Sequence, residues 1–205
     1  MSYEFDAKTP FILKIPRRLI GLIGTNGAGK SAVCDYLRDC GFLVVSLSDI
    51  VRSEVRHRNK PETRDVMVHT SNELKGQFGM DVLARRCFHE SSEKDVSSIA
   101  FDSIRNLDEV IYLREKGVIF LGIDAPIDLR YTRVTERGRA SDTVDFATFQ
   151  AHDDRENTGQ SAGQNIFQAF QECEVIIQNI GDLAALHFQV DDFLSVQLDR
   201  VGKPA

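Results

Sequence analysis

Gly24-Thr25-Asn26-Gly27-Ala28-Gly29-Lys30-Ser31 is the stretch that decides the fold of this chain. It matches the pattern G-x-x-x-x-G-K-[ST] at every required position. A short apolar run from Leu19 to Ile23 precedes it and is typical of a buried strand. After it, apolar side chains recur at the spacing of one helix face: Val33, Tyr36, Leu37 and Cys40. A strand, a glycine loop and a helix in this order are the context in which the pattern binds phosphates.

The residue types of this loop, hereafter the P-loop, suit the phosphates of a nucleotide. Glycines let backbone N–H groups converge on an anion, and the following helix adds the positive end of its dipole. Lys30 would neutralise the outer phosphates as a point charge, and the Ser31 hydroxyl would be a ligand of Mg²⁺. We therefore predict that ATP and Mg²⁺ bind here. The dinucleotide-binding pattern G-x-G-x-x-G fits less well, because Ala32 stands where its third glycine belongs.

The composition favours one globular domain spanning residues 1–205. A chain of 205 residues that is 42% hydrophobic can bury a sizeable core. Its net charge of −6 argues against a nucleic-acid polymer or a membrane surface as a partner. The four cysteines show no C-x-x-C spacing, and we interpret them as small buried side chains in a reducing compartment. Since no apolar stretch is long enough to cross a bilayer, the sequence predicts a cytoplasmic protein without a membrane segment.

Apolar runs alternate with helical patterns along the chain. We expect strands near residues 19–23, 42–48, 97–102, 118–124 and 175–179, and a last helix from Leu183 to Leu198. This alternation is typical of a parallel sheet covered by helices on both faces. The predicted fold is therefore the three-layer α/β fold of P-loop NTPases, with five parallel strands.

Three segments stand apart from this alternation. Residues 1–17 are interpreted as an N-terminal extension on the surface. A helix from Asp49 and two helical patterns within residues 61–92, the second capped by Asp81, form an expected acceptor-binding region over about 49–92. Residues 138–163 have weak apolar periodicity, and we expect an irregular lid there.

Ionisable residues follow the predicted strands at the edge where ligands bind in parallel sheets. Asp49 with Arg52 and Asp102 with Arg105 come after the second and third strands. Either aspartate could hold Mg²⁺ through water or accept a proton from an attacking hydroxyl. Taken alone, each would more simply be a helix cap or a turn residue. Two carboxylates that converge on a P-loop favour the functional interpretation.

Arginines are densest just before the expected lid. The cluster consists of Arg130, Arg133, Arg137 and Arg139. A run of arginines on a helix is usually a solvated face. Here it leads into the polar, glycine-flanked segment 138–163, so we favour a lid whose guanidinium groups grip phosphate oxygens.

With these stretches in place, the chain resembles the P-loop kinases that phosphorylate nucleoside monophosphates or dephospho-coenzyme A. Within that superfamily it is similar to a poorly characterised, largely archaeal branch. The resemblance extends from residue 18 to about 198, and it is carried by the P-loop with Ile20 to Gly24, Ser48 to Arg52, Phe101 to Arg105, Asp124 to Arg139 and Val175 to Gly181.

The resemblance implies a role for each group of residues. Asp49, Arg52 and Arg105 would face the phosphoryl acceptor. Arg137 and Arg139 would belong to the lid and, with Lys30, stabilise charge on the transferred group. Ser31 would hold Mg²⁺ directly and Asp102 through water. The loop with Asn179 and Gly181 would border the base of the donor.

Two positions depart from the family pattern. Ser103 replaces the glycine of D-G-x-R, and His152 stands before Asp153 where a lid arginine is expected. The predicted function is ATP- and Mg²⁺-dependent phosphoryl transfer to a small phosphorylated acceptor, with a nucleoside monophosphate preferred. The alternatives are a dephospho-coenzyme A kinase and a regulatory NTPase with a protein partner that the sequence does not identify.

Overall fold

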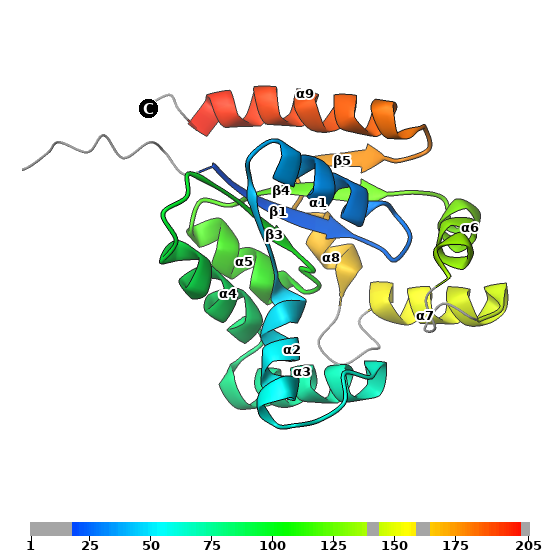
Figure 1. Ribbon diagram of the computed structural model, residues 1–205. Helices are drawn as coiled ribbons and strands as arrows, with labels where there is room; N and C mark the ends of the chain where they lie inside the picture. The colour runs from blue at the N-terminus through cyan, green and yellow to red at the C-terminus, as the bar shows by residue number, and fades with distance from the viewer. Residues whose placement is uncertain (1–17, 139–143, 159–164, 202–205) are drawn as a thin grey trace, which may run out of the picture.

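The computed structural model describes residues 18–138, 144–158 and 165–201 (Figure 1). Its described strands form one parallel sheet in the order β2-β3-β1-β4-β5, which puts β1 at the centre. The strands are β1 (Arg18–Gly24), β2 (Leu43–Ser46), β3 (Ser98–Asp102), β4 (Ile119–Asp124) and β5 (Val175–Gln178). The predicted five-stranded parallel sheet is confirmed.

Helices cover both faces of the sheet (Figure 1). α1 (Lys30–Asp39) and α9 (Leu183–Val201) lie on one face, while α4 (Val82–Ser92), α5 (Leu107–Glu115) and α8 (Ile166–Phe170) lie on the other. The remaining helices surround the carboxyl edge of the sheet: α2 (Leu47–His57), α3 (Arg64–Phe78), α6 (Ile127–Arg137) and α7 (Phe146–Thr158). This is the predicted three-layer α/β arrangement.

The burial of the central strand β1 on both faces accounts for the helical layers on either side of the sheet. Every residue after Arg18 in it is buried, and alternate side chains enter different cores. Leu19 and Ile23 belong to the core beneath α2, α4 and α5. Ile20 and Leu22 belong to the core beneath α1 and α9. A strand buried on both faces needs a continuous apolar run, which is why the sequence identified it.

Parallel strands bring all their carboxyl ends to one edge of the sheet. Ser46 pairs in register with Asp102, and Asp124 pairs with Gln178. The P-loop leaves β1 between them, since Gly24 pairs with Ile123. Segments that are distant in sequence therefore lie close together at the carboxyl edge of the sheet.

Some boundaries and one element differ from expectation. β2 ends at Ser46 and α2 begins at Leu47, two residues before the predicted helix start at Asp49. Asp81 is the N-cap residue of α4, but its side chain pairs with Arg85 and does not cap the helix. The cysteines are free, yet only Cys34 and Cys87 are buried, while Cys40 is exposed.

The prediction of an irregular segment over 138–163 was wrong for residues 146–158, which form α7. Phe149 is buried and its ring lies 5.5 Å from that of Tyr131 on α6. Asp153, one turn later, is also buried. Because the inward face of this helix mixes apolar and charged residues, it shows little apolar periodicity. The predicted lid residues 139–143 and 159–163 lie outside the described part of the chain.

A buried ion pair joins α3 to α5 beside the loop that follows β3. Lys75 of α3 lies 3.4 Å from Glu109 of α5, and their side chains are 5% and 1% exposed. Glu109 also accepts a hydrogen bond from the backbone N–H of Arg105 at 2.8 Å. Burial raises the pKa of Glu109, while the Lys75 charge and this backbone N–H oppose the shift. The pair thus anchors the loop after β3.

We predict that Lys75→Met destabilises the protein by about 3–5 kcal/mol at pH 8, because the Glu109 carboxylate stays buried without its cation. The penalty should shrink at pH 5. A carboxyl whose pKa is raised in the folded state contributes stability below its unfolded pKa, and this contribution is lost as pH rises through the folded pKa. Urea denaturation at both pH values measures the effect.

The matched control is Lys60→Met, which removes the same charge from an exposed lysine. Equal costs for the two variants at pH 8 would contradict a stabilising role for the buried pair.

Candidate functional site

The backbone of the P-loop has conformations that require glycine. Gly27 has φ 81° and Gly29 has φ 107°, a region that residues with a Cβ seldom adopt. A Cβ on Gly27 would lie 2.5 Å from the carbonyl oxygen of Arg130 in α6. A Cβ on Gly29 would overlap the side-chain amide of Asn179. The loop is therefore packed closely between α6 and the end of β5.

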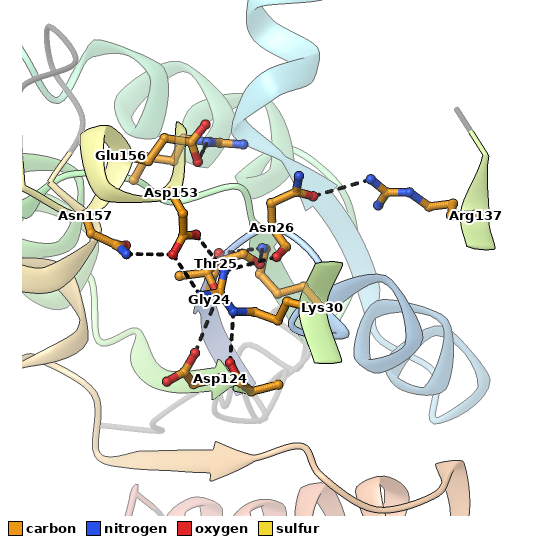
Figure 2. A network of polar contacts seen from close by, with 12 residues as sticks. Gly24, Thr25, Asn26, Lys30, Asp124, Arg137, Asp153, Glu156 and Asn157 are labelled. Carbon is orange, nitrogen blue, oxygen red and sulfur yellow. Dashed lines mark hydrogen bonds and ion pairs between the residues drawn. The ribbon is translucent and has the colours of Figure 1, made fainter. Parts of the chain in front are cut away.

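Lys30 folds back onto this loop (Figure 2). Its Nζ donates to the carbonyl oxygens of Gly24 at 2.5 Å and Thr25 at 3.1 Å. Desolvation, helped by the charge of Arg105, lowers the pKa of Lys30 to about 8, while the Asp102 carboxylate opposes the shift. A phosphate would offer this ammonium an anionic partner in place of two neutral carbonyls.

Asn179 stabilises the P-loop through a hydrogen bond to its backbone. Its side chain is 5% exposed, and Nδ2 donates to the carbonyl oxygen of Ala28 at 2.8 Å. The next residue, Ile180, is 68% exposed. Asn179 thus fixes the loop conformation, and a base-binding role for Asn179 and Gly181 stays a prediction.

Asp102 has one carboxylate oxygen available for a ligand. Oδ2 accepts a hydrogen bond from the Ser103 hydroxyl at 3.1 Å. Oδ1 is buried and has no hydrogen-bond partner among the described residues. A buried oxygen without a partner is costly unless something binds it, and water on Mg²⁺ is a suitable donor. Asp102 and the exposed residue Ser31 therefore provide oxygen ligands of the kind that the predicted Mg²⁺ site requires.

Ser103, at the family's glycine position, keeps the backbone shape that glycine would adopt. Its φ is 65°, in the left-handed region that is unfavourable for a residue with a Cβ. Its hydroxyl accepts from Ser46 at 2.9 Å, and Ser46 lies 2.9 Å from Ser48. Arg52 donates to Ser48 at 3.1 Å. A continuous polar chain thus links Arg52 to Asp102.

The predicted acceptor residues lie in two groups. Arg52 pairs with Asp49 at 2.5 Å on α2, where both side chains are largely exposed. Arg105 instead reaches α7, where its Nη1 donates to Glu156 at 3.1 Å. The same carboxylate accepts from Arg64, the first residue of α3.

The three arginines of α6 do not share one surface. Arg130 is buried, and its guanidinium binds both carboxylate oxygens of Asp153 at 2.5 and 2.7 Å. Its role is therefore to attach α7 to α6. Arg133 has a buried Nη1 that meets no hydrogen-bond partner within the described part of the chain. Arg137 reaches the P-loop by donating to Asn26 Oδ1 at 3.3 Å (Figure 2), whereas Arg139 lies outside the described residues.

A small hollow, partly open to solvent, lies beside these residues. It lies between the P-loop, α3, α6 and α7, and its lining includes Asn26, Arg64, Val134, Phe149, His152 and Glu156. His152, which replaces an expected lid arginine, thus faces the region between the P-loop and α3. Arg64, Glu156 and Asp153 were missed as site residues, since an isolated charged residue gives no distinguishing sequence signal.

Comparison with known proteins identifies the family to which the chain belongs. A family model described as an AAA domain, AAA_18, matches residues 20–182. The chain belongs to this family, and its P-loop, parallel sheet and helical layers are those of a P-loop kinase-like domain.

The relatives are archaeal UPF0200 proteins, in agreement with the predicted archaeal branch. The chain is 36% identical over 127 residues to the UPF0200 protein of Methanothrix thermoacetophila, covering 61% of this chain and 69% of that one. It is 28% identical over 185 residues to the UPF0200 protein of Methanosarcina mazei, covering 89% and 96%. This name assigns no reaction.

Solved structures agree on the fold. TT1252 from Thermus thermophilus matches with a TM-score of 0.61 at 17% identity, covering 88% of this chain and 97% of that one. Shikimate kinase from Acinetobacter baumannii in complex with shikimate gives 0.56 at 16% identity, covering 92% and 97%. Among the helices described here, none is long and apolar enough to span a membrane.

We predict that Ser103→Gly is more stable than Ser103→Ala by about 1 kcal/mol. Both variants lose the hydroxyl, but only alanine must still adopt the left-handed conformation. Urea denaturation measures the difference.

Ser48 of α2 provides the matched control, because its backbone is helical. There the order should reverse, with alanine more stable than glycine. The same order at both positions would contradict strain at Ser103.

Proposed function

We propose that this protein is an ATP- and Mg²⁺-dependent phosphotransferase whose acceptor is a small phosphorylated molecule, a nucleoside monophosphate in the first instance. One observation supports this proposal most strongly. A complete P-loop lies at the same sheet edge as Arg52, Arg105 and Asp102, whose buried Oδ1 has no hydrogen-bond partner among the described residues. The proposal treats residues 1–205 as a single kinase domain, acting in the cytoplasm.

On the donor side, the P-loop would hold the phosphates of ATP through its backbone N–H groups. Lys30 would leave the Gly24 and Thr25 carbonyls for the outer phosphates. Ser31, and Asp102 through water, would hold Mg²⁺, which supplies charge neutralisation when bound. Arg137 already reaches Asn26 of the loop and would add positive charge near the transferred group, and Arg139 is proposed to join it.

On the acceptor side, Asp49, Arg52 and Arg105 would orient the acceptor. Two arginines suit an anionic acceptor, because a phosphate offers each guanidinium charged oxygens that a neutral acceptor lacks. Asp49 would accept a hydrogen bond from a hydroxyl or amino group of the acceptor. The fold likeness to shikimate kinase supports a small-molecule acceptor and gives no substrate.

A phosphotransfer panel tests the proposal. ATP and GTP are each offered with all nucleoside monophosphates and with dephospho-coenzyme A, and phosphorylated product is measured. We predict transfer to at least one monophosphate, and that Lys30→Ala abolishes it while leaving the fold intact, as circular dichroism would show. Transfer to dephospho-coenzyme A alone would establish the first alternative. Hydrolysis without dependence on any acceptor would instead support a regulatory NTPase.

We further predict that Arg52→Ala and Arg105→Ala each lower kcat/KM for the acceptor by about 10- to 100-fold, as expected for a lost charged hydrogen bond. ATP affinity should change little. Acceptor titrations at saturating ATP, with ATP binding measured separately, distinguish the two effects. Normal acceptor use with weakened ATP binding would assign these arginines to the donor side.

A further inference from the structure

One carboxylate of α7 lies between two arginines from separate elements. Glu156 Oε1 accepts from Arg64 Nη2 at 3.3 Å, and Oε2 accepts from Arg105 Nη1 at 3.1 Å. The Glu156 side chain is 17% exposed, whereas those of Arg64 and Arg105 are 53% and 41% exposed. The two guanidinium groups thus converge on a carboxylate and remain open to solvent.

The same helix is anchored differently one turn earlier. Asp153 is held by Arg130, which also donates to the carbonyl oxygen of Asn26 in the P-loop at 3.4 Å. Figure 2 shows Asp153 reaching from α7 toward the P-loop, while the Glu156 carboxylate points to a guanidinium group elsewhere. α7 is therefore held at two points. Asp153 attaches it to Arg130 beside the P-loop (the donor-side anchor), and Glu156 attaches it to Arg64 and Arg105 (the acceptor-side anchor).

In the acceptor-side anchor, the charges of Arg64 and Arg105 exceed that of Glu156. Two guanidinium groups carry two positive charges, and the Glu156 carboxylate supplies one negative charge. A phosphate monoester carries about −1.5 to −2 at neutral pH and offers three acceptor oxygens, so it suits two arginines better. Arg64 also begins α3, whose amino-terminal end favours an anion.

We propose that Arg64 and Arg105 bind the phosphate group of the acceptor, and that Glu156 occupies their site in the free protein. The acceptor then displaces Glu156, which releases the acceptor-side anchor of α7 while the Asp153 anchor remains. This inference rests on the proposed function, and it adds Arg64 as an acceptor-binding residue and Glu156 as an internal competitor.

The test measures inorganic phosphate binding by calorimetry with the P-loop filled by Mg·ADP. Glu156→Gln should bind phosphate about five- to tenfold more tightly than the unmodified protein, because two partly exposed ion pairs no longer compete. Adding Arg64→Ala or Arg105→Ala to that variant should reverse the gain. Unchanged Mg·ADP affinity in every variant would show that each remains folded.

Glu90→Gln is the control, since it removes the same charge from an exposed position on α4. Hydrogen exchange adds an independent measurement: phosphate should lower protection of residues 146–157 in the unmodified protein but not in Glu156→Gln. Equal phosphate affinity in the unmodified protein and Glu156→Gln, or an equal gain in Glu90→Gln, would overturn the inference. Acetate that competes as well as phosphate would overturn the assignment to a phosphate group.

These measurements need no turnover, so they separate the inference from the kinase proposal. A gain in Glu156→Gln without transfer in the acceptor panel would support the anion site and overturn the kinase. Transfer without that gain would refute the competitor role of Glu156 alone.

Discussion

Close packing of the P-loop backbone is the constraint on which the rest of the site depends. Gly27 lies against the Arg130 carbonyl and Gly29 against the Asn179 amide, which also binds the Ala28 carbonyl. Arg130 and Asn179 come from α6 and the end of β5, about a hundred residues or more after the loop. The loop can hold this shape only because parallel strands bring those segments to one edge of the sheet.

Buried charges then attach the outer helices to that edge. Arg130 with Asp153 joins α7 to α6, and Lys75 with Glu109 joins α3 to α5 and the loop after β3. Such pairs are weak sources of net stability, but removing one partner is costly, so they fix geometry. The hollow beside the P-loop is lined by Asp153 of the first pair and by Arg64 of α3, the helix that the second pair attaches to α5. Charges that sequence alone would place on a surface thus shape the interior of the candidate site.

The sheet could be predicted because its central strand is buried on both faces, and a continuous apolar run such as Leu19 to Ile23 is typical of a strand in that position. α7 could not, because its inward positions include Asp153 and Glu156 as well as Phe149. Each charge is acceptable there only because a particular arginine meets it. Helical periodicity of apolar residues cannot detect a face stabilised in that way.

By itself, the sequence determined the P-loop, the order of the strands and of helices α1 to α6 and α9 along the chain, and the carboxylates and arginines that follow the strands. Their spacing and residue types carry that information locally. Only the tertiary structure decided that Arg130 is buried on Asp153, that Ser103 adopts a glycine-like conformation, and that Glu156 lies between Arg64 and Arg105. These outcomes depend on which distant charges and backbones meet in space, because an ion pair has no signature in either partner's local sequence.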